Sequence, residues 1–150
     1  MAFSFFVVRM AMMLEVPRLL EFGKRYTAAW CSRNAASVAA FFAPNGSLSV
    51  NGVPAVGRRA ITEVAQSFMT AFPDLELAMD KVFMQGDGAV YHWTFIGTNT
   101  GPDGTGHRVH FSGFEEWKFG EDGLIAESQG HFDSAAYQNQ LEHGVDEFRS

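Results

Sequence analysis

The residues best suited to chemistry lie late in the chain, at positions 125–133. Alternate residues of a β-strand share a face, and one face of this stretch is polar. Its members are Ile125, Glu127, Gln129, His131 and Asp133. If this face lines an apolar cavity, burial penalises the charge of Asp133, and His131 lies about 7 Å away along the strand. Asp133 and His131 are therefore our candidates for general acid/base catalysis on one small substrate.

The same alternation also fits a strand whose polar side faces solvent. In that case Asp133 is only the N-cap of a following helix, where an aspartate side chain accepts a backbone hydrogen bond. The sequence leaves both alternatives open. The observation that separates them is whether Asp133 lies inside an apolar cavity or in solvent.

Large aromatic side chains are the candidates for the wall of such a cavity. Fifteen Phe and three Trp are many for 150 residues, and a chain of this kind has a heavy core or lines an apolar pocket. We expect the substrate to contact the helical and strand residues Tyr26, Trp30, Phe68, Phe72, Trp93, Glu127 and Gln129.

The other histidines do not predict a metal site. His107 and His110 are three residues apart on an expected strand, so they point to opposite faces. His92 lies in an aromatic strand, where a lone histidine is more often a core or interface residue. The glycine-rich stretch 99–106 lacks the lysine of a phosphate-binding loop and predicts a turn. We therefore expect no metal and no cofactor.

Hydrophobic periodicity predicts the elements that position these residues. Apolar residues recur at helical spacing over 16–30 and 61–72, and a short helix is expected over 34–42 with Asn34 as its N-cap. Asn51-Gly52 suits the tight turn of a hairpin. After Pro73 the runs 75–85, 89–98, 107–119 and 124–132 are rich in branched and aromatic residues and predict antiparallel strands, with Gly113 at a bend.

Helices followed by a strand meander predict an α+β domain, a cone-shaped barrel in which a curved antiparallel sheet wraps around the N-terminal helices. We expect a single domain over residues 14–150, preceded by a loosely held extension over 1–13. This extension is too short to span a membrane, and the absence of a basic residue before its apolar run disfavours a secretory signal.

Composition narrows the choice of partners. The net charge of −6 disfavours nucleic acid and anionic membranes, and the single cysteine, Cys31, is typical of a reducing compartment such as the cytoplasm. A small hydrophobic molecule is the expected ligand. A homodimer is also predicted, because we expect the sheet to carry apolar side chains on both faces while the helices cover one. The side chains behind this prediction are Tyr91, Trp93, Phe95, Phe111 and Trp117.

Several short motifs occur in a fixed order. They are Gly97-Thr98-Asn99-Thr100-Gly101, Gly113-Phe114-Glu115, Gly123-Leu124-Ile125-Ala126-Glu127, Phe132-Asp133 and Gln140-Leu141-Glu142-His143-Gly144. In this order the chain resembles the SnoaL-like polyketide cyclases of the nuclear transport factor 2-like superfamily. The resemblance implies a cone-shaped α+β fold and a dimer formed through the outer sheet face. It also implies that an aspartate at the end of the last strand, matched here by Asp133, acts as general acid/base in an intramolecular aldol closure.

Our first hypothesis is therefore a cofactor-independent enzyme of the SnoaL-like type that performs aldol cyclisation or isomerisation. Asp133 removes a proton next to a carbonyl of a hydrophobic, polyketide-like substrate, and His131 or Gln129 donates a hydrogen bond to the enolate oxygen. The alternative is a non-catalytic dimeric module that binds a small apolar ligand. An epoxide hydrolase would need paired carboxylates bridged by arginine, which we do not find in the sequence.

Overall fold

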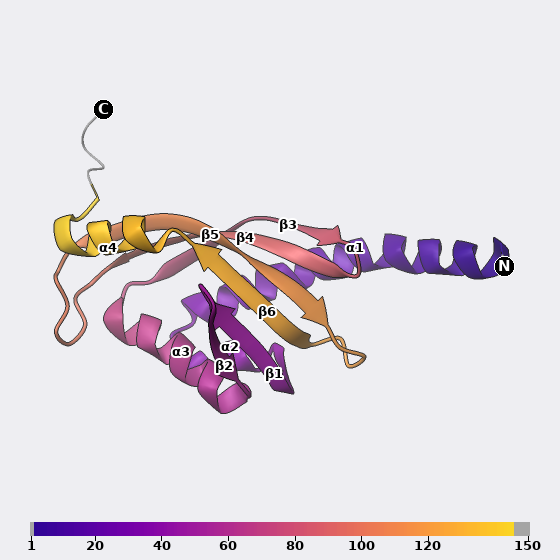
Figure 1. Cartoon of the computed structure of the whole chain (residues 1–150), viewed down its shortest axis with the longest axis horizontal. Helices are drawn as coiled ribbons and strands as arrows, with labels where there is room; N and C mark the ends of the chain where they lie inside the picture. Colours follow the sequence, from indigo (N-terminus) through magenta and orange to yellow (C-terminus); the bar gives the residue numbers. More distant parts are fainter. Residues whose placement is uncertain (1, 146–150) are drawn as a thin grey trace.

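A computed structural model describes the backbone of residues 2–145 and the side chains of residues 16–145. Helices come first and long strands follow, so the α+β class is confirmed (Figure 1). The elements are α1 (Ala2–Cys31), α2 (Ala35–Ala39), β1 (Phe42–Val50), β2 (Val53–Val56), α3 (Arg58–Ala71), β3 (Glu76–Gln85), β4 (Gly88–Thr98), β5 (Arg108–Phe119), β6 (Ile125–Phe132) and α4 (Ser134–His143).

The six strands form one sheet in the order β2-β1-β6-β5-β4-β3. Neighbours joined by short turns are antiparallel, as expected, and the hairpin turns at Asn51 and Gly52, whose φ angles are 48° and 85°. The pair β1 and β6 is parallel, which the expected antiparallel meander did not include. These two strands are separated by residues 51–124, about half of the chain, so no tight turn imposes a direction on them.

The sheet curves over a layer of helices (Figure 1). α1 packs against β3, α3 packs against α2 and β1, and α4 packs against β5 at the end of the sheet. Irregularities in strand pairing occur after Phe42 in β1, after Met79 in β3 and after Lys118 in β5. Such irregularities increase local twist and help a sheet to curl. Gly113, where we predicted a bend, also makes room for a neighbouring ring, as described below.

One face of the sheet carries the aromatic core. Tyr91, Trp93 and Phe95 of β4 alternate with outward residues and are at most 8% exposed. Phe111 and Trp117 of β5 are buried on the same concave face. These are the residues from which we predicted an apolar second face, and that reasoning was wrong because alternation places all five on one side.

Helix α1 is longer than its predicted apolar stripe. It begins at Ala2, and its N-terminal part runs past the edge of the sheet (Figure 1). Pro17 lies inside it and has no N–H to donate to the carbonyl four residues earlier. No described helix is long and apolar enough to cross a membrane. In contrast α2 is shorter than expected, and Asn34 occupies its N-cap position without a capping hydrogen bond from its side chain.

We expect deletion of residues 1–13 to leave the domain folded. The shortened helix would begin at Leu14, and Pro17 would then lie in its first turn, where a missing N–H costs little. Thermal unfolding followed by circular dichroism should give a melting temperature within about 3 °C of the full chain, which corresponds to less than about 1 kcal/mol in a domain of this size. A larger decrease would show that this segment belongs to the core.

Candidate active site

A missing side chain makes room for an aromatic ring on the concave face of the sheet. Gly113 of β5 pairs with Trp93 on one side and with Phe132 on the other, so two rings flank a position that has none. A Cβ atom at Gly113 would lie 2.5 Å from Cζ2 of Trp93 and 2.4 Å from the carbonyl oxygen of His131. Gly113 is therefore required so that the Trp93 ring can lie across the strand.

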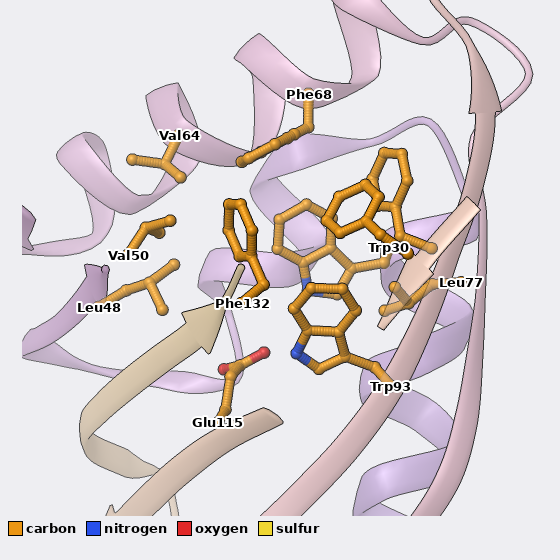
Figure 2. A pocket seen from close by; sticks show the side chains of 11 residues that line it. Trp30, Leu48, Val50, Val64, Phe68, Leu77, Trp93, Glu115 and Phe132 are labelled. Atoms are coloured by element: carbon orange, nitrogen blue, oxygen red, sulfur yellow. The ribbon is translucent and has the colours of Figure 1, made fainter. Parts of the chain in front are cut away.

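The Trp93 ring lines a cavity with a volume of about 60 Å³ (Figure 2). Its lining is almost wholly apolar and comes from α1, α3 and five strands: Trp30, Leu48, Val50, Val64, Phe68, Leu77, Trp93, Phe95, Phe111, Glu115 and Phe132. Val50, Val64, Leu77, Phe68 and Phe132 are half-buried. Four of these five come from α3 and from the C-terminal ends of β1 and β6, so we place the opening of the cavity there.

Glu115 is the one ionisable residue among those that line the cavity, and its side chain points into it (Figure 2). Three donors hold this carboxylate. Its Oε1 accepts hydrogen bonds from Tyr26 Oη at 2.9 Å, Trp117 Nε1 at 3.0 Å and Ser128 Oγ at 2.6 Å. Its Oε2 receives only a longer contact of 3.2 Å from the same Tyr26 hydroxyl. Oε2 is therefore the oxygen with free capacity.

Burial raises the pKa of Glu115, because the surroundings disfavour its charge more strongly than the hydrogen bonds from Ser128, Trp117 and Tyr26 favour it. Burial also raises the pKa of Tyr26, and the nearby Glu115 carboxylate adds to the effect. Burial raises the pKa of Tyr91 in the same way. Both phenols stay neutral at physiological pH and serve as O–H donors.

A second hydrogen-bonded chain fixes Tyr91 beside this carboxylate. Its hydroxyl donates to Thr27 Oγ1, which in turn donates to the carbonyl of Gly23 at 2.7 Å. The Tyr91 ring stacks on the Trp117 ring with centroids 4.8 Å apart. Tyr91 therefore holds in place one of the three donors to Glu115.

Three of the residues predicted to bind substrate do line the cavity. They are Trp30, Phe68 and Trp93. Tyr26 does not line the cavity. Its hydroxyl donates a hydrogen bond to Glu115, which does. Phe72 is fully buried against Phe95 and does not line the cavity.

Three members of the predicted row, Glu127, Gln129 and His131, lie on the other face of the sheet, whereas Ile125 is fully buried in the core. On that face the Gln129 amide donates a hydrogen bond of 2.8 Å to the Glu127 carboxylate, and His131 Nε2 lies 2.9 Å from Glu116 Oε1. Asp133 is exposed and accepts a hydrogen bond of 3.0 Å from the backbone N–H of Ala136 as the N-cap of α4. The expected placement of these residues at the cavity was therefore wrong, and the solvent-facing alternative describes them. The reason is strand register, because Ser128, Gly130 and Phe132 are the β6 residues that face inward.

Sequence reasoning missed Glu115 as a site residue, although its position carries a signal. In β5 the inward residues are Val109, Phe111, Gly113, Glu115 and Trp117, so one carboxylate interrupts an apolar row. A lone acid on the buried face of an alternating strand is costly unless it is paired or functional. Within residues 16–145 no cluster of His, Cys, Asp or Glu is arranged to hold a metal ion.

A family model described as the SnoaL-like domain matches residues 24–128, which include α3, β1 to β5 and the Glu115 cluster. The chain belongs to the SnoaL-like domain family. No curated protein matches it in sequence.

Solved structures share the fold of this SnoaL-like chain at low sequence identity. A candidate SnoaL-like polyketide cyclase from Jannaschia sp. CCS1 is 15% identical, with a TM-score of 0.72 over 86% of this chain and 94% of that one. A protein from Catenulispora acidiphila with a ketosteroid isomerase-like fold, in complex with trimethylamine, is 17% identical, with a TM-score of 0.70 over 81% of this chain and 92% of that one. The epoxide hydrolase/cyclase-like enzyme SalBIII, which takes part in pyran ring formation in salinomycin, is 16% identical, with a TM-score of 0.68 over 80% of this chain and 94% of that one. These similarities establish the nuclear transport factor 2-like fold.

We expect Glu115→Gln to change the pH dependence of stability in this SnoaL-like domain. The folded-state pKa is raised, so the native chain is most stable relative to the variant below the unfolded-state value of about 4.3 and loses that advantage as pH rises through the folded-state value. The difference in unfolding free energy should change by about 1.4 kcal/mol per unit of pKa difference. Urea unfolding from pH 4 to 8 measures it, with the exposed Glu121→Gln as control. A difference that is flat across this range would contradict the raised pKa.

Proposed function

We propose that this SnoaL-like protein is a cofactor-independent enzyme that moves a proton next to the carbonyl group of a small hydrophobic, polyketide-like substrate. The observation that carries the proposal is Glu115, a buried carboxylate that faces an apolar cavity and is held by three donors. Asp133, our candidate from the sequence, is replaced in this role because its carboxylate is exposed and caps α4.

The proposed step uses the free capacity of Glu115 Oε2. This oxygen takes the proton from the carbon next to the carbonyl, so a C–H bond breaks, an O–H bond forms, and the electron pair moves onto the carbonyl oxygen as an enolate. Return of the proton to a different carbon gives isomerisation. Attack of the enolate carbon on a second carbonyl forms a C–C bond, and the alkoxide that results takes the proton back from Glu115, which gives aldol cyclisation. A raised pKa makes Glu115 a stronger base than an exposed carboxylate.

The size of the cavity limits what part of the substrate enters it. A volume of about 60 Å³ is well below the roughly 300–1,000 Å³ of a site that encloses a drug-sized ligand. The reacting end of a polyketide-like molecule therefore occupies the cavity, in contact with the rings of Trp30, Phe68 and Trp93. The remainder extends through the opening between α3 and the ends of β1 and β6.

We expect the protein to accelerate hydrogen exchange next to the carbonyl of a small ketone such as butanone. In D₂O, loss of these proton signals is measured by NMR and corrected for exchange in buffer alone. Glu115→Gln keeps the shape of the side chain but cannot accept the proton, so exchange should fall about a hundredfold or more. Asp133→Asn preserves the helix cap and should exchange at the native rate.

Two outcomes would contradict this assignment. Exchange that survives Glu115→Gln would remove Glu115 from the reaction, and exchange lost in Asp133→Asn would restore the aspartate predicted from the sequence. If the native protein binds the ketone but does not accelerate exchange, the non-catalytic ligand-binding module becomes the better description.

We also propose that the protein forms a homodimer through the outer face of the sheet. A row of rings crosses four strands there: Phe83 lies 5.8 Å from His92, His92 5.5 Å from Phe114, and Phe114 4.8 Å from His131, measured between ring centroids. Phe83 is 40% exposed in the single chain. Covering such a row with a second copy would remove apolar surface from water.

Light scattering at micromolar concentration should report about twice the chain mass of 16.6 kDa. Phe83→Glu places a charge on the proposed interface and should shift the protein toward the monomer. Val53→Glu makes the same kind of change on edge strand β2, where the side chain is 70% exposed, and should not. A native protein that is monomeric at this concentration would refute the dimer.

A further inference from the structure

Trp93 brings to the cavity a hydrogen-bond donor that has no acceptor among the described residues. The residue lines the cavity and is 8% exposed. Its ring packs against the rings of Phe111 and Phe132, with centroids 5.6 Å and 6.0 Å away, and these contacts involve no acceptor for an N–H group. Figure 2 shows the nitrogen on the side of the Trp93 ring that faces Glu115.

The three tryptophans of the chain differ in where their N–H groups lie. Trp117 Nε1 donates to Glu115 at 3.0 Å. Trp30 Nε1 is sealed from the cavity and lies against the hydroxyl of Tyr26. Within residues 16–145 it is the one sealed side-chain nitrogen or oxygen without a regular hydrogen bond, so Trp93 Nε1, which also forms none, is accessible. Trp93 is therefore the tryptophan whose N–H a ligand in the cavity can reach.

Strand register places this donor next to the proposed base. Trp93 pairs with Gly113 of β5, and Glu115 is the next residue of β5 that faces inward. Such diagonal neighbours lie close enough for long side chains to reach one another, so both can contact the same small ligand. The absent side chain at Gly113 lets the Trp93 ring lie flat across the strand, which fixes the direction of its N–H.

The lining of the cavity restricts the group that this N–H can bind. A hydrocarbon would leave the donor without an acceptor, whereas a ligand oxygen would satisfy it. An anionic ligand would place a second negative charge beside Glu115, and no lysine or arginine is among the residues that line the cavity. The acceptor oxygen must therefore belong to a neutral group.

We propose that Trp93 Nε1 is the specificity-determining donor of the site, which binds the neutral carbonyl oxygen of the substrate and holds it beside Glu115. This inference rests on the proposed function for the identity of the reacting group. It adds the donor that faces the oxygen on which enolate charge develops. The sequence assigned that task to His131 or Gln129, whose side chains lie on the outer face of the sheet.

The first test follows the indole N–H signals of the ¹⁵N-labelled full chain by NMR and requires no turnover. The chain has three tryptophans, so each signal is assigned from the Trp→Phe variant that loses it. Butanone and 2-methylbut-1-ene have the same shape and differ in carrying C=O or C=CH₂. Butanone should move the Trp93 N–H proton to lower field, as a new hydrogen bond does, and the alkene should not. The Trp30 and Trp117 signals should respond alike to both probes.

The second test compares affinities between variants. Trp93→Phe keeps an aromatic ring but removes the N–H, so the affinity for butanone relative to the alkene should fall about fivefold, the effect of one typical hydrogen bond. Trp30→Phe is the matched control, because it removes an indole of the same cavity wall whose N–H is sealed, and it should keep the native ratio. If Trp93→Phe does not fold, β-(benzothiophen-3-yl)alanine at this position has the size of tryptophan and sulfur in place of N–H.

A native affinity ratio in the variant without the Trp93 N–H would overturn the proposal, and so would butanone that leaves the Trp93 signal in place. An equal fall of the ratio in Trp30→Phe would also overturn it, because the effect would then come from a lost ring and not from the N–H. Failure of Glu115 to exchange protons is a separate result, because both tests are made without chemistry.

Discussion

The rest of this structure depends on one constraint: a buried carboxylate must keep the three hydrogen-bond donors that surround it. Glu115 accepts hydrogen bonds from Tyr26 on α1, Trp117 on β5 and Ser128 on β6. These bonds tie the helix layer to two strands at one level of the cone. Leaving a buried polar group unpaired costs about 1–3 kcal/mol, so each donor fixes the position of its element as well as the carboxylate. The apolar cavity lies beside this cluster, with Glu115 among the residues that line it.

Two neighbouring glutamates show how strand register separates the site from the surface. Glu115 is 6% exposed on the concave face, whereas Glu116 points outward and lies 2.9 Å from His131. The two differ in environment only because successive residues of a strand face opposite sides. A slip of one residue in β5 would exchange them and turn the aromatic row outward, which explains why large rings are needed to keep this register.

The sequence predicted much more of the fold than of the site. Helical stripes, the Asn51-Gly52 turn and the four long strands are local patterns, and they agree with the structure to within a few residues, except that α1 begins at Ala2 rather than at residue 16. The site depends on which face of β6 points inward, and local alternation gives the two faces without saying which is covered. Asp133 and His131 were chosen from the polar face, whereas Ser128 and Phe132 are the residues directed inward. The parallel pairing of β1 with β6 was also beyond local patterns, because it joins distant parts of the chain.

That parallel pairing affects how the protein folds while it is being synthesised. Strand β6 is hydrogen-bonded to β5 on one side and to β1 on the other, so the six-stranded sheet is continuous only after residues 125–132 have been synthesised. On the ribosome, α1 to α3 and five strands emerge first, with the aromatic face of β4 and β5 partly uncovered and Glu115 without its Ser128 partner. Contacts between distant residues form slowly, and apolar surface exposed during that delay favours aggregation. Translation speed and chaperone access near the end of the message should therefore affect the yield of this domain more than the same factors earlier in synthesis.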